Sequence, residues 1–336
     1  MATTALGLSL LAGCAQQSAH KARARITAPP TTPPPGPPVA PLTGLPVWAV
    51  ANRPALSIKV DNSPPALPQS GLQNADIVTD ELVEGGITRL MATFQSQDAP
   101  IVGPIRSARP VDAALLRELG GGVFAYSGAA EGEIAPVKAD STATLISADN
   151  TPSVFDIHHG GRQAPFSTYA PTADLWAAGM RAGAPQVPPK QLFTYDSTVP
   201  PAAPPAAHLT LPMSPETSAG WDWDPASKSY LRVQNGAPDT LADGTRISTT
   251  NVVVLSVDIG HTGIFDAAGS EDPLVIVTGF GPCWVLRDGK YIPGLWGRGA
   301  ITDTVHLVDQ SGHTIPLDPG RTWMELLPRP GSPGLG

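Results

Sequence analysis

The distribution of proline constrains this chain more than any other feature of its sequence. Of 39 prolines, nine lie in residues 29–46 and nine more in residues 185–215. Proline breaks the hydrogen-bond ladder of a helix, so neither stretch is expected to form regular secondary structure. Together with 34 glycines, this content excludes a coiled coil or a helical bundle. A chain of 336 residues with these two stretches is expected to hold two compact domains.

Charge and cysteine content exclude several classes of protein. The formal net charge is −8, whereas a nucleic-acid-binding protein carries a basic surface, so no nucleic-acid partner is expected. Two cysteines cannot build a disulfide scaffold or a four-thiolate zinc site. The pair His158-His159 has no further ligand at helical spacing. We therefore predict neither a metal nor a cofactor, and we expect Cys283, in an apolar run, to be a buried inert thiol.

The first residues predict where the protein is located. A short apolar run, residues 6–11, leads into Leu11-Ala12-Gly13-Cys14, which is similar to the lipobox of bacterial lipoproteins. We expect residues 1–14 to be a lipoprotein signal peptide, and Cys14 to carry a lipid anchor at the extracytoplasmic face of the cell membrane. Residues 15–40 are then a proline-rich, disordered stalk.

The remaining chain divides at its second proline-rich stretch. Residues 41–184 are expected to form an α/β domain, residues 185–205 a linker, residues 206–328 a β-rich domain and residues 329–336 a disordered tail. The fold class is therefore α+β, with an N-terminal mixed α/β sandwich followed by a β-rich C-terminal domain. A hairpin is predicted around Glu84-Gly85-Gly86. Helices are predicted over residues 110–119, 131–139 and 172–182, and C-terminal strands over residues 251–258, 274–278, 283–287, 291–296, 304–308 and 322–327.

Charged residues are concentrated between Asp61 and Arg109 in a chain that is otherwise poor in charge. Glu81 lies on an apolar strand, where a carboxylate needs a partner because an isolated buried charge is costly. Arg106 and Arg109 are three residues apart and form a candidate fork for a phosphate or a carboxylate. The candidate ligand-binding residues are Asp61, Asn62, Glu81, Glu84, Arg89, Arg106, Ser107 and Arg109.

Three interpretations of this charged cluster stay open. It is an internal network of ion pairs, a ligand-binding site, or a catalytic site. In a catalytic site Asp61 or Glu81 would act as the base, and an arginine would stabilise an oxyanion.

Several motifs occur in order along both domains, and they resemble those of the YerB-like lipoproteins, a family of domains of unknown function. The resemblance covers most of residues 41–328 and implies a surface-anchored bacterial lipoprotein, with no activity attached. The motifs are Leu42-Thr43-Gly44-Leu45-Pro46, Val60-Asp61-Asn62, Glu84-Gly85-Gly86-Ile87-Thr88-Arg89, Gly103-Pro104-Ile105-Arg106-Ser107-Ala108-Arg109-Pro110, Arg287-Asp288-Gly289 and Pro319-Gly320-Arg321-Thr322-Trp323.

The hypothesis we favour is a non-enzymatic, membrane-anchored envelope lipoprotein. Through the charged cluster it would bind a cell-wall polymer or an envelope protein. One alternative is a wall-modifying hydrolase or transferase that uses carboxylates of the same cluster. The other is a purely structural lipoprotein without a ligand.

Overall fold

The computed structural model describes residue 1 and residues 37–198, 203–266 and 268–336. The lipobox, Cys14 and most of the predicted stalk lie outside the described residues. The end of that stalk belongs to the folded body, because Val39 forms a β-bridge with Pro46 and Ala40 is buried. The body thus begins a few residues before position 41.

The first half of the body mixes strands with short helices. Its strands are β1 (Leu56–Asp61), β2 (Ile77–Leu82), β3 (Thr88–Phe94), β4 (Gly122–Tyr126) and β5 (Ala143–Ser147). Its helices are α1 (Asp112–Glu118), α2 (Glu131–Asp140) and α3 (Thr172–Arg181), with 3-10 turns η1 (Pro64–Ala66), η2 (Leu72–Asn74), η3 (Glu84–Gly86), η4 (Pro152–Val154) and η5 (His159–Gly161).

The second half contains strands but no helix within its described residues. They are β6 (His208–Pro212), β7 (Ser218–Asp224), β8 (Ser229–Gln234), β9 (Ala237–Pro238), β10 (Ser248–Thr249), β11 (Asn251–Phe265), β12 (Glu271–Ile276), β13 (Gly279–Arg287), β14 (Lys290–Arg298), β15 (His306–Asp309), β16 (Thr322–Pro328) and β17 (Gly334–Leu335). The predicted α+β class, with a mixed α/β half followed by a β-rich half, is confirmed.

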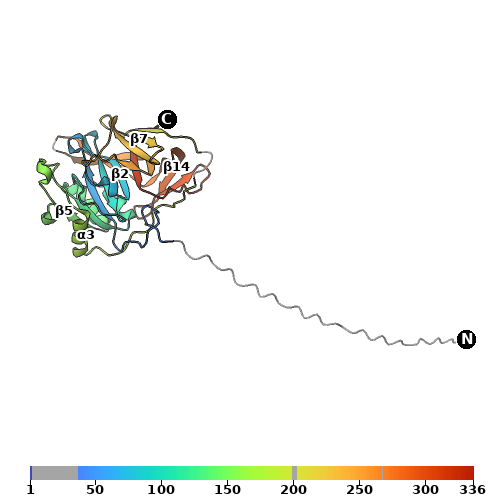
Figure 1. Cartoon of the computed structure of the whole chain (residues 1–336), viewed down its shortest axis with the longest axis horizontal. Coiled ribbons are helices and arrows are strands. Elements are labelled where there is room, and N and C mark those ends of the chain that lie inside the picture. Colours follow the sequence, from blue (N-terminus) through green and yellow to red (C-terminus); the bar gives the residue numbers. More distant parts are fainter. Residues whose placement is uncertain (2–36, 199–202, 267) are drawn as a thin grey trace. The chain divides into compact units, whose positions relative to one another are not determined.

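One large sheet runs through both halves (Figure 1). Its strand order is β15-β14-β13-β11-β16-β2-β3-β1-β4-β5, with β12 paired to β11 outside this path. The halves meet where β16 pairs in parallel with β2, in a register that sets Thr322 beside Ile77 and Glu325 beside Asp80. A smaller sheet, β10-β8-β7-β6-β17, comes from the second half alone.

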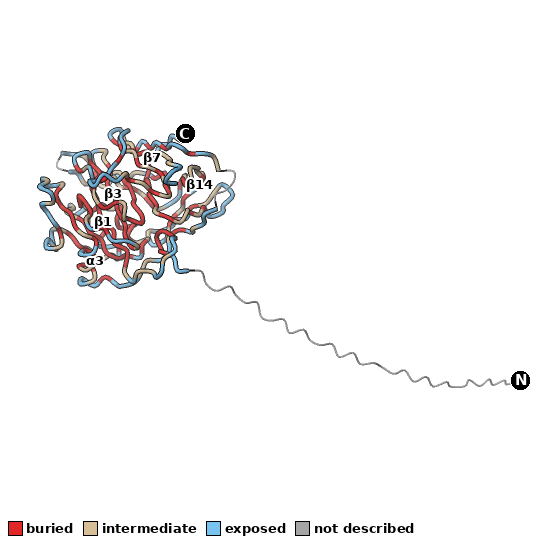
Figure 2. The backbone as a smooth tube through the Cα atoms, viewed as in Figure 1, coloured by how far each residue is buried: buried red, intermediate tan, exposed pale blue. Residues whose placement is uncertain are grey.

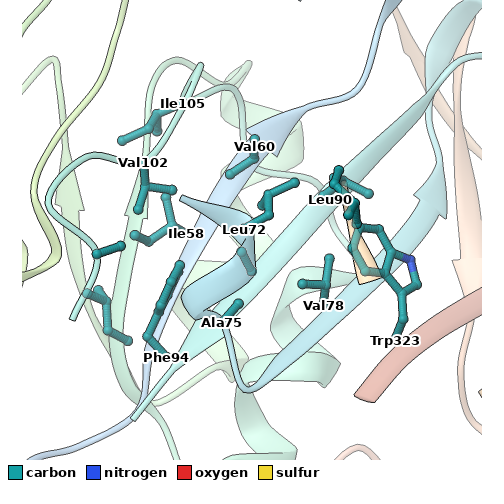
Figure 3. Close-up of a cluster of buried hydrophobic side chains, with 14 of the residues drawn as sticks. Ile58, Val60, Leu72, Ala75, Val78, Leu90, Phe94, Val102, Ile105 and Trp323 are labelled. Carbon is teal, nitrogen blue, oxygen red and sulfur yellow. The ribbon is translucent and has the colours of Figure 1, made fainter. Parts of the chain in front are cut away.

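Each face of the large sheet carries its own core, because side chains alternate along every strand. Val78, Leu90 and Trp323 lie on one face and belong to a core shared with Trp221 of the small sheet and Leu175 of α3 (Figure 3). Figure 2 shows buried residues concentrated along the central strands β1 and β3. The opposite face is covered by α1 and α2. Its core contains Met91 and Met324 from the sheet, Leu116 from α1 and Val137 from α2.

Three consecutive glycines, the last of which begins β4, are required there for a steric reason. Gly120, Gly121 and Gly122 all have positive φ, between 79° and 97°, which is the region that glycine tolerates best. A Cβ on Gly122 would lie 2.4 Å from the carbonyl oxygen of Ala55, and one on Gly121 would lie 2.6 Å from that of Thr142. These glycines allow a close approach of two backbones.

Local patterns predicted most elements of the large sheet and its helices. The hairpin around Glu84-Gly85-Gly86 is β2–β3, and the Asp288-Gly289 turn joins β13 to β14. The tryptophans of the second half pack in the cores, with Trp221, Trp296 and Trp323 buried. The second proline-rich stretch holds more regular structure than expected, since Tyr195 forms a bridge to Leu317 and β6 lies near the end of the stretch. Strands β6–β8 were not predicted.

Candidate functional site

The charged cluster lies where β1 and β2 end and β3 begins, on the sheet face covered by α1 and α2. Its innermost part joins Lys59 of β1 to Glu81 of β2 and to Asp112 of α1, and all three side chains are fully buried. The ammonium donates to Asp112 over 2.7 Å and also to Glu81. Burial raises the pKa of Glu81 to about 8, against the opposing charge of Lys59.

Glu84 organises the middle of the cluster. It follows β2, in the 3-10 turn η3, and therefore lies outside the alternation of the strand. Arg109 donates to both of its carboxylate oxygens, and Arg89 donates over 3.1 Å. Burial alone would raise the pKa of Glu84, but Arg89 and Arg109 outweigh it and hold that pKa at about 2. Glu84 therefore favours its ionised form at neutral pH, between the guanidinium groups of Arg89 and Arg109.

Arg109 has further acidic neighbours from two other elements. Its guanidinium lies 3.3 Å from Glu133 of α2 and 3.1 Å from Asp272 of β12. It also donates to the carbonyl of Ala108 over 2.7 Å. Burial lowers the pKa of Arg109, but hydrogen bonding to Glu84 and the nearby acids raise it above its ordinary value. This arginine is occupied by residues of the chain itself.

Arg106 forms the outer part of the cluster. Its Nε lies 3.4 Å from Asp61, and its side chain is 24% exposed. Its guanidinium makes one hydrogen bond among the described residues, a long one of 3.5 Å to the carbonyl of Pro165. Burial and neighbouring Arg89 lower the pKa of Arg106. Beside it, the hydroxyl-bearing Ser107 is partly exposed, and its carbonyl accepts from Arg89.

Asp61 and Asn62 are buried residues that shape the loop after β1. Asp61 accepts a 2.8 Å hydrogen bond from the backbone of Ser63. The amide of Asn62 donates to Thr88 and accepts from Gln69, both over 2.8 Å. The structure therefore brings all eight predicted site residues to one end of the sheet, but it buries most of them in mutual contacts. The predicted fork of Arg106 and Arg109 is not formed, because Arg109 is enclosed by acids.

The sequence did not single out four residues that complete the cluster: Lys59, Asp112, Glu133 and Asp272. Lys59 carries a signal, since it is the only basic residue in the fully buried strand β1. Asp272 carries none, because it lies 163 positions after Arg109, its ion-pair partner, in the other half of the chain. Its position depends on how the two halves pack.

A second buried cluster occupies the opposite face of the sheet. Arg232 of β8 is fully buried and pairs with Asp80 at 2.8 Å, Asp239 at 3.0 Å and Glu325 at 3.3 Å. Its guanidinium carbon lies 4.4 Å from the ring centre of Trp323. The Arg232 cluster joins the two halves of the large sheet to the small sheet.

The three acids around Arg232 outnumber it, and two of them have an oxygen without a donor. Oδ1 of Asp80 and Oε2 of Glu325 are both buried without a hydrogen-bond donor. Strand pairing sets these two residues side by side. Burial, followed by the adjacent Asp80, raises the pKa of Glu325 to about 8. A proton on Oε2 of Glu325 that is donated to Oδ1 of Asp80 would give both orphaned oxygens a partner.

The other candidates from the sequence, Cys283 and the possible metal ligands, show no feature of a functional site. Cys283 is a free, buried cysteine, and burial raises the pKa of its thiol to about 12. Within the described residues, no group of three potential ligands is placed to hold a metal ion. The helices in that part of the chain are also too short or too polar to span a membrane.

Comparison with known families explains the motif series. Residues 42–184 match the N-terminal domain, and residues 209–324 the C-terminal domain, of the "Protein of unknown function (DUF3048)" family. The chain belongs to the DUF3048 family. The resemblance to YerB-like proteins is thereby confirmed, and the family description carries no activity.

One curated relative and one solved structure agree with this assignment. The "Putative lipoprotein YerB" of Bacillus subtilis (strain 168) is 27% identical over 296 residues, 86% of each chain. A crystal structure of YerB protein from Bacillus subtilis matches with a TM-score of 0.76 and 24% identity, over 88% of this chain and 99% of that one. The structural match shows that this DUF3048 chain shares the fold of that protein.

Proposed function

We propose that this DUF3048 chain is an extracytoplasmic protein, held at the cell membrane by a lipid on Cys14 and carrying its folded body on the stalk. The lipobox at residues 11–14 supports the anchor, as does the printed description of the Bacillus relative as a lipoprotein. The division into domains at residues 41–184 and 206–328, joined by the linker at 185–205, is part of this proposal.

The body binds a negatively charged group of a cell-wall polymer or an envelope protein at its exposed arginine. The observation that carries this proposal is the state of Arg106, a partly exposed guanidinium with one long hydrogen bond. A guanidinium has five N–H donors in a planar fork that fits phosphate or carboxylate oxygens. Ser107 offers a hydroxyl next to it, while Asp61, Asn62, Glu81, Glu84, Arg89 and Arg109 hold the loop around it in place.

Binding is favoured over catalysis because the carboxylates are not accessible. Glu81 and Asp61, the bases of the hydrolase hypothesis, are buried at 0% and 2% exposure. Each of them contacts a cation within the chain. A general base must reach the proton that it removes from a substrate, and neither residue faces an open cleft in the described part of the chain.

The binding proposal is tested by replacing Arg106. Purified Arg106→Gln protein should lose at least about tenfold in affinity for a polyol-phosphate wall polymer or for a carboxylate-rich wall peptide. The two ligands identify which anion is preferred. Arg181→Gln, which removes an exposed arginine from α3, is the matched control. Equal binding by Arg106→Gln and the native protein would reject the site, and binding of neither ligand by the native protein would favour a purely structural role.

The anchor is tested separately. Cys14→Ala should move the protein from the membrane fraction to the soluble fraction. Membrane association that survives both this substitution and a salt wash would reject the lipid anchor.

A further inference from the structure

A hairpin arm from the second half of the chain covers the charged cluster of the first half. β11 lies in the large sheet up to Val257, which pairs with Pro328 of β16. From Asp258 onward it pairs only with β12. Residues 258–265 and 271–276 thus form an arm that leaves the sheet, which we call the β11–β12 arm. Strand β12 of this arm carries Asp272 to Arg109.

Asp272 is held in an unusual way for a buried carboxylate. Its side chain is 3% exposed, yet neither of its oxygens accepts a hydrogen bond in the described structure. The nearest donor atom, Nε of Arg109, lies 3.1 Å away but gives its single hydrogen to Glu84 over 2.9 Å. Asp272 therefore has Coulomb attraction without a hydrogen bond. A buried acceptor in this state loses more on desolvation than it recovers.

The surrounding charges show why the contact is weak. Burial raises the pKa of Asp272 to about 7 despite Arg109, and the nearby carboxylates of Glu84 and Glu133 raise it further. Glu84 and Glu133 come from the first half of the chain and remain beside Arg109 whether or not the arm is in place. Of the three acids around Arg109, the one on the arm is the one most easily displaced.

The apolar contact of the arm is also narrow. Ile264 packs against Gly132 in the first turn of α2, where an added Cβ would lie 2.9 Å from the Ile264 methyl group. The base of the arm is fixed to the body, because Val275 is buried in the core and Asp258 pairs with Arg329. Its outer end is more exposed, with His261 at 89% and Phe265 at 62%. A small apolar contact and an unsatisfied ion pair hold this outer end over the cluster.

We propose that Asp272 occupies the position of an anionic ligand, and that displacement of the β11–β12 arm opens a second anion subsite at Arg109, next to Arg106. The ligand class is the phosphate or carboxylate that the proposed function assigns to Arg106, and the inference rests on that function for its biological role. Two neighbouring arginines would then hold a ligand that bears two anionic groups.

The test uses inorganic phosphate and NMR of the arginine Nε–Hε groups in the folded body. In the native protein, phosphate should shift the Arg106 signal and leave Arg109 unchanged. In Asp272→Asn, which keeps the shape of the side chain, phosphate should also shift Arg109 and bind at least about fivefold more tightly. Ile264→Ala, which loosens the arm without changing charge, should act in the same direction.

Asp258→Asn is the matched control, because it removes the same charge from the base of the arm, where Asp258 pairs with Arg329. If Asp258→Asn gains as much affinity for phosphate as Asp272→Asn does, the gain comes from net charge alone and the inference is overturned. The inference is also overturned if phosphate does not shift the Arg109 signal in either Asp272→Asn or Ile264→Ala. An Arg106 signal that never responds, beside an Arg109 signal that responds in Asp272→Asn, would reject the proposed function and leave the subsite standing.

Discussion

Replacing Glu325 by glutamine should flatten the dependence of folding stability on pH. A glutamic acid has an ordinary pKa of 4.5, and in the folded chain the pKa of Glu325 is about 8. Between these values the folded state holds a proton that the unfolded state has lost, so the free energy of unfolding falls as pH rises. One such group contributes about 1.4 kcal/mol per pH unit. From pH 5.5 to 7.5, Glu325 alone costs the native protein about 3 kcal/mol.

Glutamine copies the protonated acid, so the substitution should be nearly neutral below the ordinary pKa of 4.5 and stabilising by about 1.4 kcal/mol at pH 5.5. Its amide oxygen can still accept the 2.9 Å hydrogen bond from Trp221, and its amide nitrogen can donate to Asp80. At pH 7.5 the variant should be more stable than the native protein by about 4 kcal/mol, because it has no proton to lose.

Urea unfolding at pH 5.5, 6.5 and 7.5, followed by tryptophan fluorescence, measures this difference. Trp221 and Trp323 both pack against Arg232 and report on the cluster. Glu216→Gln, at an exposed position, is the matched control and should run parallel to the native protein. A Glu325→Gln variant that is less stable than the native protein by more than about 2 kcal/mol at every pH would refute the reasoning, because Glu325 would then act as an ionised partner of Arg232.

Three further predictions concern stability and reactivity. Lys59→Met should cost about 3–5 kcal/mol in urea unfolding, because it leaves Glu81 and Asp112 buried without their cation. A loss under about 1 kcal/mol would show that the ammonium of Lys59 contributes little to stability. Cys283 should react with a thiol reagent only as fast as the chain unfolds, since it is buried and its pKa is raised to about 12; a fast reaction in native buffer would contradict this. Gly122→Ala should lower stability by more than about 2 kcal/mol, and Gly120→Ala by less, because only the former brings a Cβ against a backbone oxygen. Equal losses in thermal melting would show that the positive φ of both glycines, and not this close contact, causes the destabilisation.

Sequence patterns predicted the local elements because each depends on neighbouring residues. The Glu84-Gly85-Gly86 turn and the Asp288-Gly289 turn carry their own signals, and so do the strands that they join. Because side chains alternate along a strand, Asp80 and Glu81 of β2 lie on opposite faces of the sheet. Their partners, Arg232 and Lys59, could not be assigned, because pairing depends on which elements lie against each face.

The candidate site was predicted in composition and only partly in arrangement. All eight residues gather at one end of the sheet, but the sequence could not show that Arg109 is enclosed while Arg106 remains open. That difference is set by Asp272 and Glu133, which come from distant elements. The same limit applies to the pairing of β2 with β16, which no local pattern encodes.

The pairing of β2 with β16 has a consequence for how the protein folds. It joins residues 77–80 to residues 322–325, so the large sheet has contacts that are very distant along the chain. Loop closure on this scale is slow, and β2 must keep an unpaired edge until the last long strand has been synthesised. An unpaired edge recruits other strands. The chain is therefore most prone to aggregate while its final 15 or so residues are still missing, and truncation before Thr322 should leave that edge permanently open.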